Sequence, residues 1–478
     1  MNKAESSAPE IRDRVGHPMI DGDGHLVEVR HALVGFAHAR GEDSLFDDPV
    51  ARGLLVPGQE HLRFPPLAQR RRLYTHKANR WFTPANTRDY ASVTMPGLMH
   101  ERLPETGFDF AVVYPTFGIH IAHVPGEKAR RGLCGLYNEM VAEDYAPFRD
   151  RLSPVAILPL STPEEGIEEL EHALSLGLKA FLIPSFVWRA IPAFAGAPPE
   201  YASRVRRMDT FGCDSEYDYD PFWKRAVELN APISAHLSGA ALPDHISPSN
   251  SLFSAGQFAA TAQLLAKSLF LGGVLHRFPE LRVGLLEGGV AVGVRLYSDF
   301  VGRFEKRGPR GLAGLDPGSI DTAELAGLAG RYNRRLVDLP EEGLVPALAA
   351  EEGGDNDFEA SGVGSASDIR NQFCRSFFWG CEGDDPLVGV AFDQRVNPLG
   401  AVVPAFVGSD IGHWDVPSFG HPLTEAYEQV ERGVLTPDQF RDFTFRNAVR
   451  FYAGDRSDFF ADTAVAAAAK ETVDGGRA

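Results

Sequence analysis

A repeated alternation of short apolar runs and longer amphipathic segments constrains the fold of this chain more than any other feature. Amphipathic stretches with helical spacing, such as residues 163–176, 253–271 and 291–306, follow several of the runs. Strand–helix units repeated in this way predict a parallel α/β fold, and a count of eight strands favours a closed TIM (β/α)₈ barrel over an open doubly wound sheet. The sequence offers seven or eight strands, with candidates near residues 20, 110, 153, 181, 233, 283, 378 and 406.

The predicted barrel accounts for residues 18–455 as one domain, although 478 residues would ordinarily suggest more than one. Within it, residues 30–106 lack a clear period and are expected to form an irregular cap region. Residues 307–366 are rich in Gly and acidic side chains, which predicts an insertion. We expect a flexible N-terminus over residues 1–17 and a flexible tail over residues 456–478.

Composition narrows the possible partners and the compartment. Asp plus Glu (65) exceed Lys plus Arg (47), and the net charge of −18 argues against binding to nucleic acid. No apolar run is long enough to span a membrane, and the first residues lack the apolar stretch of a secretory signal. The four cysteines form no CxxC pair. We therefore expect a cytoplasmic protein with free thiols, acting on a small molecule and not on a membrane.

Polar residues recur where the predicted strands end, which is the active face of a barrel. Asp23 and His25 lie two apart on the first strand, so their side chains are expected to point the same way. His236 and Asp410 follow the apolar residues of two other strands. Four N/O ligands converging on one axis suit Zn²⁺ or Mn²⁺. Taken singly, each has a simpler interpretation: an acidic turn, a hydrogen-bonded core histidine, or a helix N-cap.

Several segments, in this order along the chain, resemble the amidohydrolase superfamily, in its amidohydrolase-related branch of aminocarboxymuconate semialdehyde decarboxylase-like enzymes. The resemblance covers roughly residues 18–306 and 370–455. It is carried by IDGDGHLVE, AVVYPTFG, PISAHLSG, GGVLHRFPELRVGLLEGG, FVGSDIGHWD and FRNAVRFY. It implies a distorted TIM barrel, often a homodimer, with one divalent metal ion, Zn or Mn. By position, the implied ligands are Asp23, His25, His236 and Asp410, with Asp410 also a plausible base.

Two positions depart from the family pattern. Asp23 stands where the family usually has His or Glu, and a shorter side chain needs a closer backbone; Asp21 is the substitute ligand if Asp23 fails to reach. Glu287 stands where decarboxylases of this branch carry a catalytic His. An ionised glutamate would repel a carboxylate substrate. This favours a proton-transfer role for Glu287, with orientation of His236 as the structural alternative.

The remaining candidates surround the expected metal. His413, in the loop after Asp410, could donate a proton or orient an oxyanion, or simply bond to the backbone. Tyr114, Trp414, Arg80 and Arg88 are predicted to contact substrate, although packing or a solvated helix would also explain them.

The preferred function is a metal-dependent hydrolase that uses a metal-activated water on a small aromatic or carboxylated metabolite. The alternative is non-oxidative decarboxylation of an aromatic or unsaturated carboxylic acid. A third hypothesis is a non-catalytic metal-binding barrel.

Overall fold

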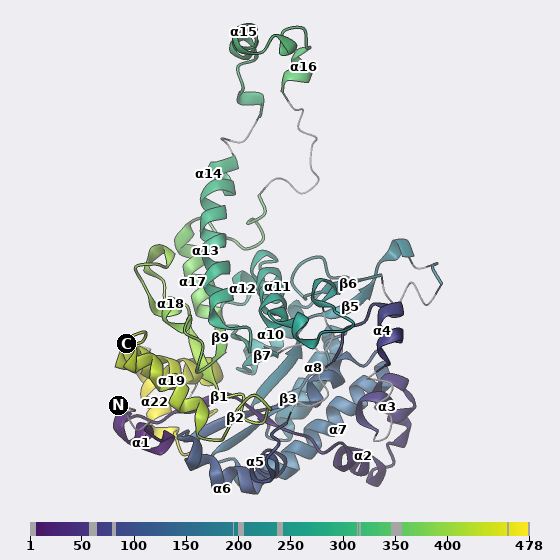
Figure 1. The fold of residues 1–478 in the computed structure, drawn as a ribbon, viewed down its shortest axis with the longest axis vertical. Helices are drawn as coiled ribbons and strands as arrows, with labels where there is room; N and C mark the ends of the chain where they lie inside the picture. The colour runs from purple at the N-terminus through teal and green to yellow at the C-terminus, as the bar shows by residue number, and fades with distance from the viewer. Residues whose placement is uncertain are drawn as a thin grey trace.

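The computed structural model describes residues 6–56, 65–78, 83–194, 196–198, 205–236, 242–312, 314, 317–345, 356–456 and 458–476. Its centre is a sheet of eight parallel strands wrapped into a nearly closed barrel, with helices outside it (Figure 1). The strands, in their order around the barrel, are β1 (Ile20–Leu26), β2 (Phe110–Pro115), β3 (Leu152–Ile157), β4 (Ala180–Pro184), β7 (Ile233–His236), β8 (Val283–Leu285), β9 (Phe377–Glu382) and β10 (Ala405–Gly408). The predicted TIM barrel is therefore confirmed.

The barrel closes between its last and first strands just beyond the end of β10. The backbone N–H of Asp410 donates to the carbonyl of Asp23 at 3.1 Å, and the N–H of His25 donates to the carbonyl of Ile411 at 2.7 Å. These two bonds fix the spacing between β1 and the loop after β10. Consequently they also fix the distance between the polar side chains that both segments carry.

The helices of the outer layer bury the apolar stripes seen in the sequence. Helix α8 (Pro163–Ser175) begins where the hydroxyl of Thr162 accepts the N–H of Glu165 at 3.3 Å, with Pro163 in the first turn. Other helices of the layer are α7 (Glu127–Tyr145), α10 (Asp220–Glu228), α11 (Gln257–Leu271), α13 (Val290–Arg307), α17 (Ala366–Ser376) and α19 (His421–Glu431).

The C-terminal segment forms what we call the floor of the barrel: the residues of α21 (Asn447–Ala453) and α22 (Ala466–Gly475) that join the inward-facing strand side chains in one buried cluster. Phe451 stacks on Phe406 of β10, with ring centroids 5.6 Å apart. Gly284 in β8 lacks a side chain where a Cβ would lie 2.5 Å from the Phe451 ring. The segment expected to be a flexible tail thus contains a helix whose residues Ala469 and Val473 are buried.

The N-terminal segment, also expected to be flexible, contains helix α1 (Ala8–Val15), which contacts α19 and α6 (Pro96–Thr106). Its residues Ala8 and Ile11 are buried, because the helix turns this side toward its neighbours. The N-terminal segment is polar on average, so its composition does not reveal this short apolar stripe.

The expected cap region is built of short helices, namely α2 (Arg30–Ala39), α3 (Pro49–Leu55), α4 (Leu67–Leu73), α5 (Thr87–Thr94) and α6. The 185–219 segment, which has no regular pattern in the sequence, contains an antiparallel hairpin of β5 (Val187–Ala190) and β6 (Arg206–Asp209). The acidic insertion carries α15 (Thr322–Tyr332) and α16 (Glu341–Leu344) at the tip of an arm that projects beyond α13 (Figure 1).

Candidate metal centre

A bulge in β1 sets the direction of its acidic side chains. The pairing of β1 with β2 shifts between Asp21 and Gly24, so an extra residue is inserted on the β1 side. Asp23 packs against β10, where a Cβ on Gly408 would lie 2.7 Å from that of Asp23. Only glycine at position 408 allows this close approach. The approach explains how the short Asp23 side chain comes close to the barrel axis.

Asp21 has a different task from the one considered as an alternative. Its carboxylate accepts the backbone N–H of Ser409 at 3.0 Å and the Ser409 hydroxyl at 2.5 Å. It also accepts the N–H of Asp23 at 3.2 Å. Burial raises the pKa of Asp21 to about 6. These bonds tie β1 to the end of β10, so Asp21 positions the loop that carries Asp410 and does not join the cluster of ligand atoms.

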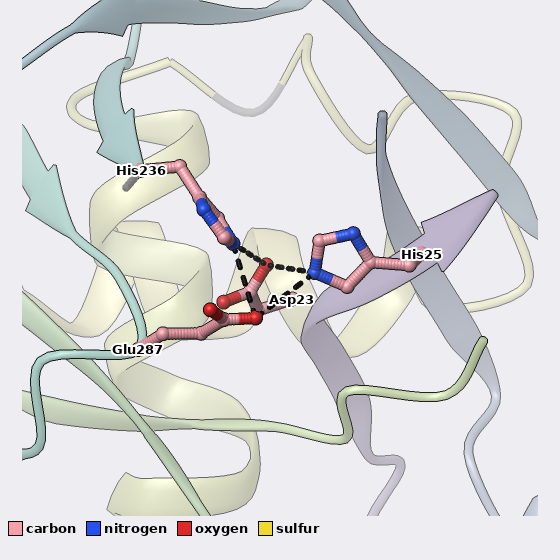
Figure 2. Close-up of side chains that lie close together, drawn as sticks. All are labelled: Asp23, His25, His236 and Glu287. Atoms are coloured by element: carbon pink, nitrogen blue, oxygen red, sulfur yellow. Dashed lines mark hydrogen bonds and ion pairs between the residues drawn. The ribbon is translucent and has the colours of Figure 1, made fainter. Parts of the chain in front are cut away.

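Four side chains meet at the mouth of the barrel, as Figure 2 shows. Oε1 of Glu287 lies 3.2 Å from Nε2 of His25 and 3.2 Å from Nε2 of His236. Oδ1 of Asp23 lies 3.7 Å and 3.8 Å from the same two nitrogens. One ligand atom from each residue lies within 4.8 Å of all the others, a spacing that one cation can bridge.

Asp410 and His413 extend the cluster on its other side. Oδ1 of Asp410 lies 3.5 Å from Nε2 of His25 and is in close contact with Nδ1 of His413. Together with Glu287 these residues form a second group of ligand atoms within 4.8 Å of one another. Both Asp410 and Glu287 have positive φ angles, 52° and 51°, which non-glycine residues seldom adopt. Such backbone strain tends to gather at functional sites.

The electrostatics of the cluster favour a bound cation. Burial, together with neighbouring carboxylates, raises the pKa values of Asp23 and Asp410 well above normal. Burial and the nearby His413 lower the pKa of His25 to about 3, so its ring is neutral and able to coordinate. Oδ1 of Asp23 is buried and accepts no hydrogen bond within the described part of the chain. A divalent cation would give this atom a partner and offset the clustered negative charge.

The donor set therefore fits one divalent ion, Zn²⁺ or Mn²⁺. Asp23, His25 and His236 are three of the four ligands expected from the sequence. Glu287, which was expected to act in proton transfer, supplies a carboxylate oxygen to both groups. Although burial alone would raise its pKa, His236 and His25 lower the pKa of Glu287 well below normal, so the carboxylate is ionised.

The residues predicted to contact substrate differ in their burial and in their distance from the cluster of candidate ligands. Tyr114 is fully buried, its ring lies 6.0 Å from that of His236, and its hydroxyl bonds to that of Tyr452 at 3.0 Å; it supports the cluster from the floor side. Trp414 is 53% exposed beside His413. Arg80 lies outside the described residues.

The substrate-binding hypothesis for Arg88 is not supported by its position. The side chain lies on α5, is largely exposed and pairs with Glu105 of α6 at 3.2 Å. Arg70 of α4 also makes contacts within the chain, since it donates to the backbone carbonyls of Pro65 and Pro248. The exposed position of Arg88 agrees with the alternative of a solvated helix.

A cavity of about 270 Å³ lies next to Glu287. The charged residues among those that line it are all acidic, and besides Glu287 they are Glu382, Asp384 and Asp385. Glu382 is the last residue of β9, and Asp384 and Asp385 follow it closely. Sequence reasoning missed them, although their position at a strand end was a usable signal.

Two further residues beside the cluster were also missed. Glu28 is buried and accepts the backbone N–H groups of Thr116, Phe117 and Gly118, at 2.8 to 3.2 Å. The hydroxyl of Thr116 lies 3.3 Å from Nε2 of His413. Glu28 closes the IDGDGHLVE motif, three residues after His25, which was the available signal.

A set of side chains that could hold a metal ion thus lies at the mouth of a (β/α)₈ barrel. The family model described as Amidohydrolase matches residues 20–307, which include Asp23, His25, His236 and Glu287. The chain belongs to this family, and it is an enzyme of the amidohydrolase superfamily. A comparison with curated protein sequences finds no match.

A comparison with solved structures finds matches at low sequence identity. They include an amidohydrolase from Mycobacterium avium subsp. paratuberculosis (17% identity, 76% of each chain, TM-score 0.46). The 2,6-dihydroxybenzoate decarboxylase from Rhizobium has 14% identity over 91% of this chain and 98% of its own, with a TM-score of 0.47. The 5-carboxyvanillate decarboxylase from Sphingomonas paucimobilis has 13% identity over the same shares, with a TM-score of 0.49. This level of similarity does not define the reaction.

Among the described residues, no helix is long and apolar enough to cross a lipid bilayer.

Proposed function

We propose that this enzyme is a metal-dependent hydrolase whose small substrate is neutral or positively charged where it enters the cavity beside Glu287. The acidic lining of that cavity is the observation that carries the proposal. Glu287, Glu382, Asp384 and Asp385 line the same space. Although burial and neighbouring carboxylates raise the pKa of Glu382 to about 7, a carboxylate substrate would meet negative charge there. We therefore favour a neutral or positively charged substrate over the carboxylated metabolite expected from the sequence, which stays the alternative.

Asp23, His25, His236 and Glu287 would hold the cation, and Asp410 belongs to the second group, which shares His25 and Glu287 with the first. The cation, Zn²⁺ or Mn²⁺, would lower the pKa of a water molecule toward 7 and polarise the scissile bond. Asp410 accepts the proton of the attacking water. His413, whose Nδ1 contacts Asp410, takes up that proton and can return it to the leaving group.

A matched series of aryl amides and esters tests the proposal. Its members carry an ammonium, a hydroxymethyl or a carboxylate group at the same position, and the enzyme is loaded with Zn²⁺ or Mn²⁺. We expect kcat/KM to be about tenfold higher for the ammonium than for the carboxylate member, with the difference shrinking at high salt. In the double variant Glu382→Gln, Asp385→Asn, the ratio of kcat/KM between the ammonium and the carboxylate member should be smaller, because two acidic groups of the cavity lining are removed.

The competing reaction gives a clear contrary result. Release of CO₂ from aromatic carboxylic acids, at rates above hydrolysis of every member of the series, would show the enzyme to be a decarboxylase. In that case Glu287→His should raise the rate of CO₂ release.

We also propose a homodimer in the cytoplasm. Light scattering of the purified chain, at concentrations spanning the micromolar range, tests the dimer. Fractionation of the source cells tests the location.

A further inference from the structure

We propose that Thr116 is a positioning residue that fixes the orientation of the His413 ring, and that Glu28 holds Thr116 in place for this purpose. Thr116 follows β2 and Glu28 follows β1. Neither residue belongs to the ligand groups. The kinetic part of the inference rests on the proposed hydrolysis, whereas the orientation of the ring does not.

The directions of the hydrogen bonds assign the proton on the ring. A threonine hydroxyl has one hydrogen, and that of Thr116 is donated to the carbonyl of Leu26 at 2.7 Å. Its oxygen can then only accept from Nε2 of His413, which lies 3.3 Å away. Nε2 therefore carries a hydrogen, and Nδ1 is the ring atom that faces Asp410.

Glu28 makes the position of this hydroxyl rigid. Oε2 of Glu28 accepts the N–H groups of Thr116 at 3.2 Å and Phe117 at 2.8 Å, and Oε1 accepts that of Gly118 at 2.8 Å. A Cβ at Gly118 would lie 2.7 Å from Oε1, so glycine is required for this approach. Because Glu28 is only 5% exposed, these bonds are shielded from water. The location of the Thr116 hydroxyl is thus set by the barrel strands.

The orientation matters for the direction of proton transfer. In the proposed reaction an O–H bond of water breaks and its proton goes to the Asp410 carboxylate. It then moves to Nδ1 of His413, where an N–H bond forms while Nε2 keeps its hydrogen toward Thr116. A ring rotated by half a turn about its Cβ–Cγ bond would present carbon to Asp410 and could not accept this proton.

The state of the ring can be observed without a substrate. The full chain is loaded with Zn²⁺ and labelled with ¹⁵N-histidine, and long-range ¹H–¹⁵N correlation reports which nitrogen of each ring is protonated. The His413 signals are assigned by their absence in His413→Gln. We expect Nε2 to be protonated in the wild type and in Thr116→Ser, and Thr116→Val to show mixed or broadened His413 signals. A wild type in which Nε2 lacks a proton, or Thr116→Val spectra identical to the wild type, would overturn the proposal.

Kinetics give a second, separate readout on the best substrate of the series. Thr116→Val should lower kcat by about 10- to 100-fold while KM changes less than about twofold. Thr116→Ser, which restores the hydroxyl, should recover kcat to within about threefold of the wild type. Zinc content and melting temperature are measured for each variant, and a loss of zinc in Thr116→Val would mean that Thr116 acts on the metal ligands instead. Absence of turnover throughout the series would contradict the proposed hydrolysis, but the ring spectra would still decide the role of Thr116.

Discussion

The mouth and the floor of this barrel fill the same interior in opposite ways. At the mouth, β1, β8 and β10 bring Asp23, Glu287 and Asp410 together with histidine rings. At the floor, α21 inserts Phe451 against the aromatic side chains of the strands. The floor is stabilised mainly by the packing of apolar and aromatic side chains, with a few buried hydrogen bonds such as that between Tyr114 and Tyr452. The mouth gathers like charges in a buried place, and a bound cation would offset them. The residues that stabilise the fold and the candidate catalytic residues thus lie at opposite ends of the barrel interior.

Removing a candidate ligand at the mouth should have the largest effect on the enzyme. His236→Ala should reduce bound metal from about one ion per chain to background and abolish turnover, because one of the converging nitrogens is lost. Elemental analysis after dialysis measures this. His276→Ala, which changes an exposed histidine away from the cluster, is the control and should keep its metal. Full metal content in His236→Ala would mean that the ion binds elsewhere.

Removing an aromatic ring at the floor should have the opposite signature. Phe451→Ala is expected to lower the free energy of unfolding by about 3–5 kcal/mol, because it leaves a cavity among buried rings. The metal content of the folded protein should stay at one ion per chain. Urea unfolding and elemental analysis test both expectations, with Phe253→Ala as a control because that ring is 54% exposed. Loss of metal in folded Phe451→Ala would show that floor and mouth are not independent.

A buried histidine beside the floor should make stability depend on pH. Burial lowers the pKa of His17 to about 4, and its Nε2 lies 3.1 Å from the hydroxyl of Thr444. The unfolded chain, with a pKa of about 6.5, binds a proton that the folded chain excludes. The contribution of neutral, buried His17 to the free energy of unfolding is therefore complete above about pH 6.5. It is lost as the pH falls through 4, the pKa of His17 in the folded chain.

The size of this effect should be about 1–3 kcal/mol, since partial access of water screens it. Urea unfolding at a series of pH values compares the wild type with His17→Gln, which should have a flatter profile over this range. An equal slope in both proteins would rule out His17 as its source.

The smallest effect is expected on the surface, away from both ends of the barrel interior. Arg88→Ala removes an exposed ion pair with Glu105 and should change stability by less than about 1 kcal/mol. Metal content and KM should not change. A raised KM would restore the hypothesis that Arg88 contacts substrate, and would require a large movement of α5.

The barrel could be predicted because its strands are buried on both faces and therefore appear as continuous apolar runs, as in β2 (FAVVYP). The candidate ligands could be predicted because parallel strands bring their carboxyl ends to one edge. Asp23, His25 and His236 needed only that placement. That they bind a metal stays a prediction until the ion is measured.

Other features depend on contacts that no local pattern reveals. The bulge at Asp23 relies on the close approach of Gly408 from the other end of the barrel sheet. Glu287 joins the ligand atoms because its backbone adopts a positive φ, which the residue type itself disfavours. The burial of the Ala-rich C-terminal segment depends on the barrel interior that receives it. Arg88 could not be resolved because a charged helix residue does not indicate its partner.

One hydrogen bond that shapes β1 can form only late in the synthesis of the chain. The hydroxyl of Tyr452 donates to the carbonyl of Gly22 at 2.7 Å, inside the bulge that carries Asp23, across 430 positions of the chain. A ribosome releases the first strand long before it has synthesised Tyr452. The nascent chain therefore holds Asp23 and His25 without the contact that shapes their backbone. The backbone around Asp23 can therefore take its final form only after α21 has been synthesised.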